Sequence, residues 1–473
     1  MRKNFSAFFR AFFITLLVML VLAGAAYIVF SWFGFSSGLE SLSASLRNFP
    51  LLGGLFSMLM DCVPGGLPSH LAGLLLLFVL ISIFSALIWV TQSVPLAFIV
   101  VSAFAIPLSG YSAAYLIQEL ITRIGRNSFL ILSLLIPIMA GMGLNFGMVL
   151  GAMAGQIGLL FIYDWGIAGI PGMVLACLIG TPIAILLGIF CGAVLNRAKG
   201  REMVTSYILG FFINGVYQMV VLYLMGWIIP IHSPSLLLSR GYGVRNAVSL
   251  LGIRGVLDNL IPAIIAGTES TGQFLNLQAA SPNAFIVMHL PFLQGAIRIP
   301  LGTLIVIALF CAFIVWFRKT KLGQDMRAIG QNQAVSDSAG IAVNKTRIIA
   351  IVISTVLACY GQIIYLQNMG TLNTYNSHDQ TGMFSIAALL IGGASVARAS
   401  IANVFAGVIL FHLMFIVAPM AGKNLVGDAQ IGEYFRVFVS YGIIAISLVL
   451  HAWRRNREHQ AARRSLRGDK GGE

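Results

Sequence analysis

Apolar segments long enough to cross a lipid bilayer recur along almost the whole chain. A helix needs about 20 mostly apolar residues to span the hydrocarbon core. Charged residues form only 9% of the 473 residues, whereas soluble domains carry roughly 25%, so a water-soluble fold is excluded. The candidate spans are 11–30, 71–91, 94–117, 129–143, 144–163, 170–196, 203–228, 295–317, 347–367, 382–395, 401–420 and 432–452.

These spans predict an all-α, polytopic membrane protein with about ten to twelve transmembrane helices. Backbone groups in lipid must pair within the protein, which leaves helices or closed barrels. Continuous apolar runs, rather than alternation of apolar and polar residues, indicate helices. The first apolar stretch follows three basic residues as in a signal peptide, but it is long enough to span the membrane, which favours an uncleaved first helix.

The net charge of +14 is explained by short basic clusters beside the apolar segments, so it does not indicate a nucleic-acid partner. Lys and Arg concentrate on the cytoplasmic side of membrane proteins. The clusters at 197–201 and 318–347, the N-terminus and the Arg-rich tail after Trp453 are therefore predicted to be cytoplasmic. Arg123 and Arg126 fit poorly, because a simple count of spans places them outside.

The positions of the apolar spans and of the basic clusters predict three regions. Residues 1–70 form an N-terminal transmembrane helix and an extracytoplasmic segment, and residues 453–473 form a basic cytoplasmic tail. Residues 71–452 form the transmembrane core, with an extracytoplasmic loop at 230–290 and a cytoplasmic loop at 318–347.

Two glycine-rich interruptions divide apolar segments. In the first, glycines repeat every four residues and share one face of a helix, which allows close helix packing. Tight packing alone explains this pattern, and a translocation pathway is the functional alternative, because two amides interrupt the same apolar run. Gly392 and Gly393 mark the second interruption, and broken segments in corresponding halves are typical of translocation paths. The residues of the first interruption are Gly143, Asn145, Gly147, Gly151, Gly155 and Gln156.

The spans almost lack the carboxylates and histidines that ion-coupled carriers bury. His412 is well inside a span, Asp164 ends another, and no phosphate-binding loop, catalytic triad or metal-ligand spacing is present. Four of the five cysteines lie in apolar segments, so neither disulfides nor zinc are expected. The chain is therefore expected to be no enzyme and to need no cofactor or metal. An apolar multi-helix protein without catalytic or ion-coupling groups is expected to be a passive pore or a carrier powered by another subunit.

A polar run from Thr320 to Asn344 separates two spans, and it has the composition of a docking surface. Its small residues permit close approach of another backbone, and its polar residues can contact a soluble partner; an ordinary solvated loop is equally compatible with this composition. The candidate coupling residues are Thr320, Gly323, Arg327, Ala328, Gly330, Asn332, Ala334 and Gly340.

Thr320-Lys-Leu-Gly, Arg327-Ala-Ile-Gly-Gln-Asn332 and Ala339-Gly-Ile341 together resemble the cytoplasmic signature of one permease family. It is the ABC-importer membrane-subunit family that includes branched-chain amino acid, ribose and nucleoside permeases. The glycine helix at 143–151 and the late Gly-Gly helix at 384–395 are similar to the same family. The three matches occur in order over most of residues 130–450.

The resemblance implies a type II importer fold in a bacterial inner membrane. It further implies a second permease subunit, identical or homologous, two ATPase subunits that bind ATP and dock on the cytoplasmic loops, and an extracytoplasmic binding protein. A small polar solute, such as a sugar or nucleoside, would pass near Asn145, Gln156 and Gly392. The alternative is an ion-coupled secondary carrier that uses His412 or Asp164 as its coupling group.

Overall fold

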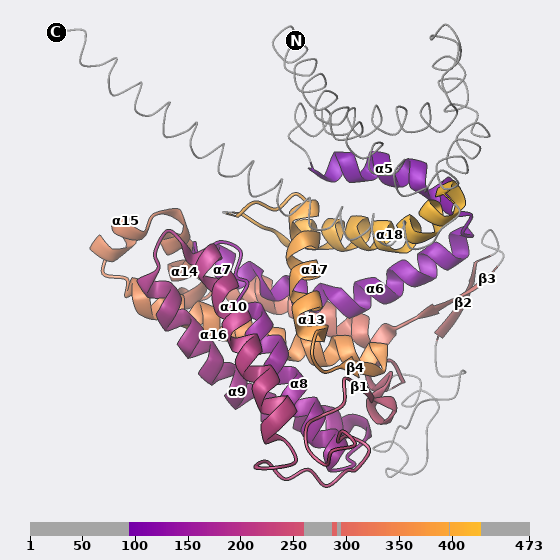
Figure 1. The fold of residues 1–473 in the computed structure, drawn as a ribbon. Helices are drawn as coiled ribbons and strands as arrows, with labels where there is room; N and C mark the ends of the chain where they lie inside the picture. Colours follow the sequence, from indigo (N-terminus) through magenta and orange to yellow (C-terminus); the bar gives the residue numbers. More distant parts are fainter. Residues whose placement is uncertain (1–93, 260–285, 291–294, 397, 427–473) are drawn as a thin grey trace, which may run out of the picture. The chain divides into compact units, whose positions relative to one another are not determined.

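The computed structural model describes residues 94–259, 286–290, 295–396 and 398–426 (Figure 1). The helices are α5 (Val94–Ser109), α6 (Ala113–Ser133), α7 (Leu135–Met139), α8 (Met148–Asp164), α9 (Gly169–Arg197), α10 (Glu202–Met219), η1 (Val220–Leu224), η2 (Leu251–Ile253), α13 (Leu301–Phe317), α14 (Lys321–Gln331), α15 (Gln333–Ser338), α16 (Val343–Met369), α17 (Ser377–Ile391) and α18 (Ile401–Val426). The strands are β1 (Ala247–Ser249), β2 (Ile286–Leu290), β3 (Gly295–Ile299) and β4 (Thr371–Asn373).

The chain divides into two compact units. One unit comprises residues 1–116 and 410–448, and its described part contains α5 and the second half of α18. The other comprises 117–409 and 449–473, and its described part contains the helices from α7 to α17.

Three helices, α8, α9 and α16, form the centre of the larger unit and lie side by side (Figure 1). A Cβ at Gly155 of α8 would stand 2.6 Å from the carbonyl oxygen of Cys359 on α16, and one at Gly151 would overlap that of Thr355. Small residues therefore let the backbones meet, as the four-residue spacing in the sequence predicts. In this way α8 and α16 are in direct backbone contact.

Helix α9 uses the same close packing through small residues along its whole length. Small residues occupy every fourth position on its buried side, where Gly188 and Gly192 approach the Cα atoms of Val352 and Ile348 of α16. Large apolar side chains cover the opposite side and are exposed, as expected for a face in contact with lipid. The buried small residues are Gly172, Ala176, Gly180, Ala184, Gly188 and Gly192, and the exposed apolar residues include Val174, Leu178, Ile185, Leu186 and Ile189.

Five helical segments of the described residues are long and apolar enough to cross a membrane, or six if α13 and α14 count as one span bent by 73°. The predicted all-α polytopic fold is therefore confirmed. Three of the predicted spans, 11–30, 71–91 and 432–452, lie outside the described residues. The total of ten to twelve crossings consequently stays a prediction.

The predicted loop between 117 and 129 is instead part of α6, so the sequence interpretation of this region was wrong. Glu119 and Arg123 form an ion pair of 3.3 Å one helical turn apart, which makes the charged stretch compatible with a helix. Arg126 donates from Nε to Oδ1 of Asn368, 2.8 Å away, at the C-terminal end of α16. The cytoplasmic-loop candidate joins the N-terminal end of α16, so Arg126 lies at the opposite end of that helix.

Short strands cover the end of the helices near Arg126. Strand β1 pairs with β4 in antiparallel register, with Val248 opposite Leu372. Both of these side chains are buried against the same apolar core as α8 and α16. Strand β4 leads directly into α17, so this small sheet fixes where α17 begins.

We predict that Gly151→Ala destabilises the protein, because the added methyl group overlaps the Thr355 carbonyl group. Overpacking of this kind costs about 1–3 kcal/mol. Gly215→Ala on α10 is the matched control, because a Cβ there meets no atom within 4 Å. Thermal unfolding in detergent should show a lowered Tm for Gly151→Ala and an unchanged or raised Tm for Gly215→Ala. Equal Tm values would contradict the close-packing interpretation.

Candidate functional site

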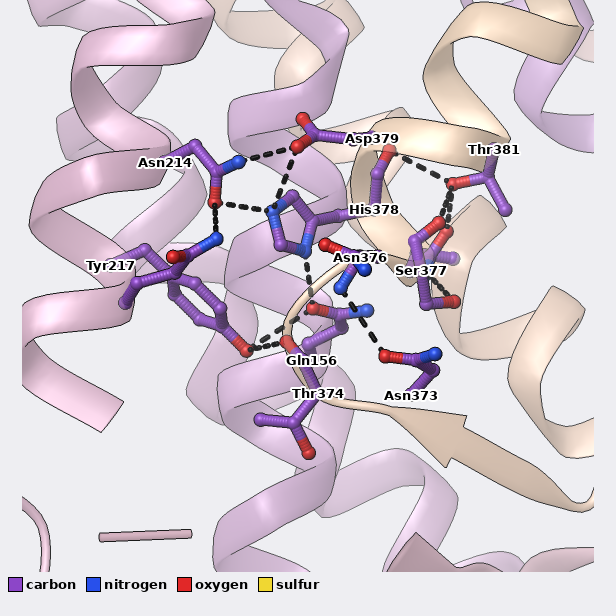
Figure 2. Close-up of polar contacts among 12 residues, drawn as sticks. Gln156, Asn214, Tyr217, Asn373, Thr374, Asn376, Ser377, His378, Asp379 and Thr381 are labelled. Carbon is purple, nitrogen blue, oxygen red and sulfur yellow. Dashed lines mark hydrogen bonds and ion pairs between the residues drawn. The ribbon is translucent and has the colours of Figure 1, made fainter. Parts of the chain in front are cut away.

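A cluster of buried polar side chains joins α8, α10 and α17 (Figure 2). His378 lies at its centre, with Nδ1 2.8 Å from Oε1 of Gln156 and Nε2 2.9 Å from Oδ1 of Asn214. The Asn214 amide group donates to Oδ2 of Asp379. The Tyr217 hydroxyl lies 3.1 Å from both Gln156 Oε1 and the carbonyl oxygen of Thr374. Three helices are thereby linked by one continuous set of hydrogen bonds.

The cluster lies deep in the membrane part of the chain. Asn214 is twelve residues after the start of α10, about 18 Å along the axis of an α-helix. It therefore lies well inside the candidate membrane span Glu202–Leu224, away from both of its ends. Buried polar groups cost free energy unless they are hydrogen-bonded, and polar residues at this depth commonly have a function.

The hydrogen-bond roles follow from the Asp379 carboxylate. A carboxylate only accepts, so Asn214 presents its NH2 group to Asp379 and its oxygen to His378. His378 Nε2 therefore carries a hydrogen. Two arrangements satisfy Nδ1: a doubly protonated ring that donates to Gln156 Oε1, or a neutral ring that accepts from the Gln156 amide turned by 180°. The second arrangement avoids burying a positive charge.

In both arrangements one end of the Gln156 amide is left without a partner. As oriented, the Nε2 atom of Gln156 is buried and makes no hydrogen bond among the described residues. Turning the amide exchanges this unpaired donor for an unpaired acceptor. Gln156 has no exposed surface, so the missing hydrogen bond is not replaced by bulk water at its side chain.

A second set of hydrogen bonds continues from the cluster along α17. Gln362 of α16 donates to Ser377 Oγ at 3.3 Å and accepts from Thr381 Oγ1 at 2.8 Å. These contacts fix the first turns of α17 against α16. The side chains around His378 are therefore held from both the α10 and the α16 sides.

The two glycine-rich interruptions meet in space. Each is a break between two helices: residues 140–147 separate α7 from α8, and residues 392–400 separate α17 from α18. Gly143 has a φ of +70°, and a Cβ there would stand 2.9 Å from Cγ1 of Val396. Asn145 accepts from the Gly147 N–H at 2.9 Å and so shapes the first break.

The polar run from Thr320 to Asn344 folds into α14 and α15. Thr320 caps α14 by accepting from the Gly323 N–H at 3.2 Å, and Asn332 caps α15 by accepting from the N–H groups of Ala334 and Val335. Asn332 has an extended backbone, with φ −156° and ψ 110°, which ends α14 before α15 begins. The spacing of Gly330 and Ala334, four residues apart, predicts that they share one face of a single helix; this prediction is wrong, because the break places them on different helices.

Helix α14 rests against the first glycine break. A Cβ at Gly330 would overlap the carbonyl oxygen of Met139 and stand 3.2 Å from the nitrogen of Gly141. The Cβ direction of Gly330 thus points at the protein's own break, while the residue itself is exposed. Arg327 is also exposed.

A buried arginine ties this segment to two further helices. Arg347, at the start of α16, has no exposed surface and forms an ion pair of 2.5 Å with Glu202 at the start of α10. Its Nη1 atom donates to Oε1 of Gln333, the first residue of α15, at 3.3 Å. In the sequence, Arg347 is recognisable only as one residue of the basic cluster at 318–347.

The structure brings together only some of the predicted site residues. Gln156 belongs to the polar cluster, whereas Asn145 belongs to the first break. Gly147 and Gly151 pack against Cys191 and α16, respectively, and Gly392 packs against Asn403 of α18. Gly340 and Gly393 have positive φ values in turns, and Ala328 is half-buried on α14. A role of these residues in a pathway stays a prediction.

The two groups that an ion-coupled carrier could use, Asp164 and His412, lie in different surroundings. Asp164 accepts from the backbone N–H groups of His232 and Ser233, each at 2.7 Å, so its carboxylate holds a loop in place. His412 is buried in α18, where its ring contacts Phe411 and Phe415. His412 belongs to the smaller unit, and Asp164 to the larger.

Sequence reasoning missed Asn214, Tyr217, His378 and Asp379. His378 and Asp379 stand just before the predicted span 382–395 and read as part of a polar loop, although α17 begins at Ser377. Asn214 and Gln218, four residues apart in the apolar span 203–228, were a usable signal, because amides at that spacing share a helix face. No spacing rule connects them to His378.

A family model described as branched-chain amino acid transport system / permease component matches residues 132–449. Three curated relatives are a probable ABC transporter permease protein, YphD, of Escherichia coli K12, an autoinducer 2 import system permease protein, LsrC, of Klebsiella pneumoniae, and a nucleoside ABC transporter permease protein, NupB, of Lactococcus lactis. They are 28, 29 and 26% identical over 167, 167 and 151 residues, which is 35, 33 and 31% of this chain. The matched part spans 48, 44 and 38% of their own lengths, that is, less than half. No solved structure matches the chain.

We predict that Tyr217→Phe lowers stability, because it removes the hydroxyl group between Gln156 and the Thr374 carbonyl group. An unpaired buried acceptor costs about 1–3 kcal/mol. Tyr223→Phe is the control, because Tyr223 is 56% exposed. Thermal unfolding in detergent should lower the Tm only for Tyr217→Phe; an unchanged Tm would show that the hydroxyl group is dispensable.

Proposed function

Because the chain belongs to the family of branched-chain amino acid transport system / permease components, we propose that it is the membrane-spanning permease subunit of an ATP-driven ABC importer. ATP would be bound and hydrolysed by separate ATPase subunits. The solute would be delivered by an extracytoplasmic binding protein and would pass beside a second permease subunit.

The contact between α14 and the first glycine break supports this proposal most directly. Gly330 of α14 touches Met139 and Gly141, and Gly143 of the same break touches Val396 of the second break. A displacement of α14 therefore reaches both breaks through van der Waals contact. An importer needs such a connection, because ATP hydrolysis happens outside the membrane and must bias the helices between two states.

The exposed side of α14 and α15 is the proposed docking surface for an ATPase. It carries Arg327 on α14, and the other face of the helix, through Met326 and Ile329, is buried in the permease. A hollow of about 190 Å³ next to α15 offers further polar groups to a partner. Its lining residues are Lys199, Gln333, Ala334, Asp337, Val343 and Asn344.

A small polar solute is proposed, since the names of the relatives refer to autoinducer 2 and to nucleosides. Residues 31–70 and 230–290 would contact the binding protein on the outer side, and a bacterial inner membrane is the proposed location. Family membership favours this function over the ion-coupled carrier. The placement of Asp164 supports that choice, because its carboxylate is occupied by two backbone N–H groups.

Arg327→Glu should abolish solute-stimulated ATP hydrolysis in the assembled complex by reversing a charge on the docking surface. The permease should still fold, because Arg327 is exposed and makes no buried contact. Lys423→Glu is the control, since Lys423 is an exposed cation on α18 and is not part of the proposed docking surface. ATPase activity is measured in proteoliposomes with and without solute-loaded binding protein. Normal stimulation of Arg327→Glu with the ATPase bound would place the coupling surface elsewhere.

The orientation is tested by cysteine labelling. The native cysteines are replaced by serine, and single cysteines are introduced as Gln324→Cys in α14, Ser465→Cys in the tail and Ser235→Cys in the loop after η1. A membrane-impermeant maleimide added to intact cells should label Ser235→Cys and miss the other two, because dense Lys and Arg keep those segments cytoplasmic. Labelling of Gln324→Cys in intact cells would invert the topology and remove the ATPase-docking proposal.

A further inference from the structure

We infer that the polar cluster at the start of α17 is a contact site for an uncharged solute rich in hydroxyl or amide groups, with the carboxylate of Asp379 as the group that touches it. This inference rests on the proposed importer function. It adds the chemical class of the solute and the position of a contact in the pathway.

The cluster reaches from the interior of the subunit to its surface. His378 and Gln156 have no exposed side-chain surface, whereas the Asp379 side chain is 33% exposed. Gln218, half-buried, donates to Asn214 Oδ1 at 3.3 Å on the same side of α10. A solute moving along this surface therefore meets Asp379 and Gln218 without any opening of the core, and the buried Asn214 lies behind them.

The carboxylate of Asp379 is oriented but not saturated. Its Oδ2 atom accepts from Asn214 and lies 3.9 Å from His378 Nε2. Its Oδ1 atom makes no hydrogen bond to another described residue. A carboxylate accepts from two directions at each oxygen, so a pair of solute hydroxyl groups can bind there.

The charges around the site discriminate between solutes. Among the described residues that hydrogen-bond within this cluster, none is Lys or Arg, and the carboxylate of Asp379 is its acidic group. A carboxylate or phosphate on the solute would meet a like charge in a poorly solvated place, which is unfavourable. Hydroxyl and amide groups would find both donors and acceptors. The site therefore suits a neutral sugar or nucleoside better than an amino acid, whose ammonium group Asp379 could hold but whose carboxylate would meet no Lys or Arg in the described cluster.

The unpaired end of the Gln156 amide is an independent sign that this cluster is more than a structural tie. A network that only stabilised the fold would lose free energy by leaving a fully buried amide group unsatisfied. Natural proteins retain such groups where another requirement holds them in place. Here Gln156 orients His378, His378 orients Asn214, and Asn214 orients Asp379. Gln156 and His378 are therefore positioning residues.

The test uses the purified permease–ATPase complex without a binding protein, so that the solute preference measured belongs to the permease. Saturation-transfer NMR titrations give Kd values for D-ribose, adenosine and L-leucine. The wild-type complex should bind ribose or adenosine more tightly than leucine. Asp379→Asn should weaken that binding about tenfold or more, as expected for a lost hydrogen bond to a charged group, and Asp379→Glu should restore part of it.

Glu119→Gln is the matched control, because Glu119 is also a partly exposed carboxylate but lies on α6 outside the cluster. It should leave every Kd unchanged. Co-purification of the ATPase should be unaffected in all variants, which separates loss of contact from loss of folding, and unstimulated ATPase activity should be unaffected in Glu119→Gln. Tighter binding of leucine, or an unchanged Kd for Asp379→Asn, would overturn the inference.

The importer function is measured separately, as ATP-dependent uptake into proteoliposomes with the binding protein present. Uptake of ribose or adenosine that proceeds without any detectable binding to the permease–ATPase complex would overturn the contact site and leave the importer function intact. A complete complex that shows no ATP-dependent uptake of the three probes would contradict the importer function, and the inference with it.

Discussion

Backbone-to-backbone packing of α8, α9 and α16 is the constraint on which the rest of this structure depends. Helices surrounded by lipid gain little from burying apolar side chains against one another, so close packing and polar contacts must hold them together. Small residues every four positions on α8 and α9 provide the packing, and the carbonyl groups of Thr355 and Cys359 on α16 receive them. Within the larger unit, α7, α10, α14, α15 and α17 pack against this three-helix centre.

A rigid centre allows movement to be confined to the places where helices are broken. The breaks at 140–147 and 392–400 touch each other through Gly143 and Val396, and α14 touches the first break through Gly330. Contacts this close transmit a displacement, because packed atoms cannot be compressed. The glycines that look like a packing pattern in the sequence thus also join α14 to the breaks between the apolar helices.

Burying a polar group among membrane helices costs free energy, and the structure gathers such groups into two sets. One set, around His378, links α8, α10 and α17; another, around Arg347, links α10, α15 and α16. The members of each set come from different helices, so neither set exists without the tertiary fold. In each set one buried atom makes no hydrogen bond among the described residues, Nε2 of Gln156 in the first and Nε of Arg347 in the second. The first set reaches the surface at Asp379.

The sequence by itself determined that the chain is helical and crosses the membrane, because apolar length and lack of charge are local properties. It also determined the glycine face of α8, which depends on residues four positions apart. It could not place His378 against Gln156, 222 residues away, or turn Gly330 toward Gly141. Those contacts, and the helical course of α6 through Arg123 and Arg126, were decided by tertiary structure, because side chains from distant helices supply the partners that make a buried polar group or an approach of two backbones favourable.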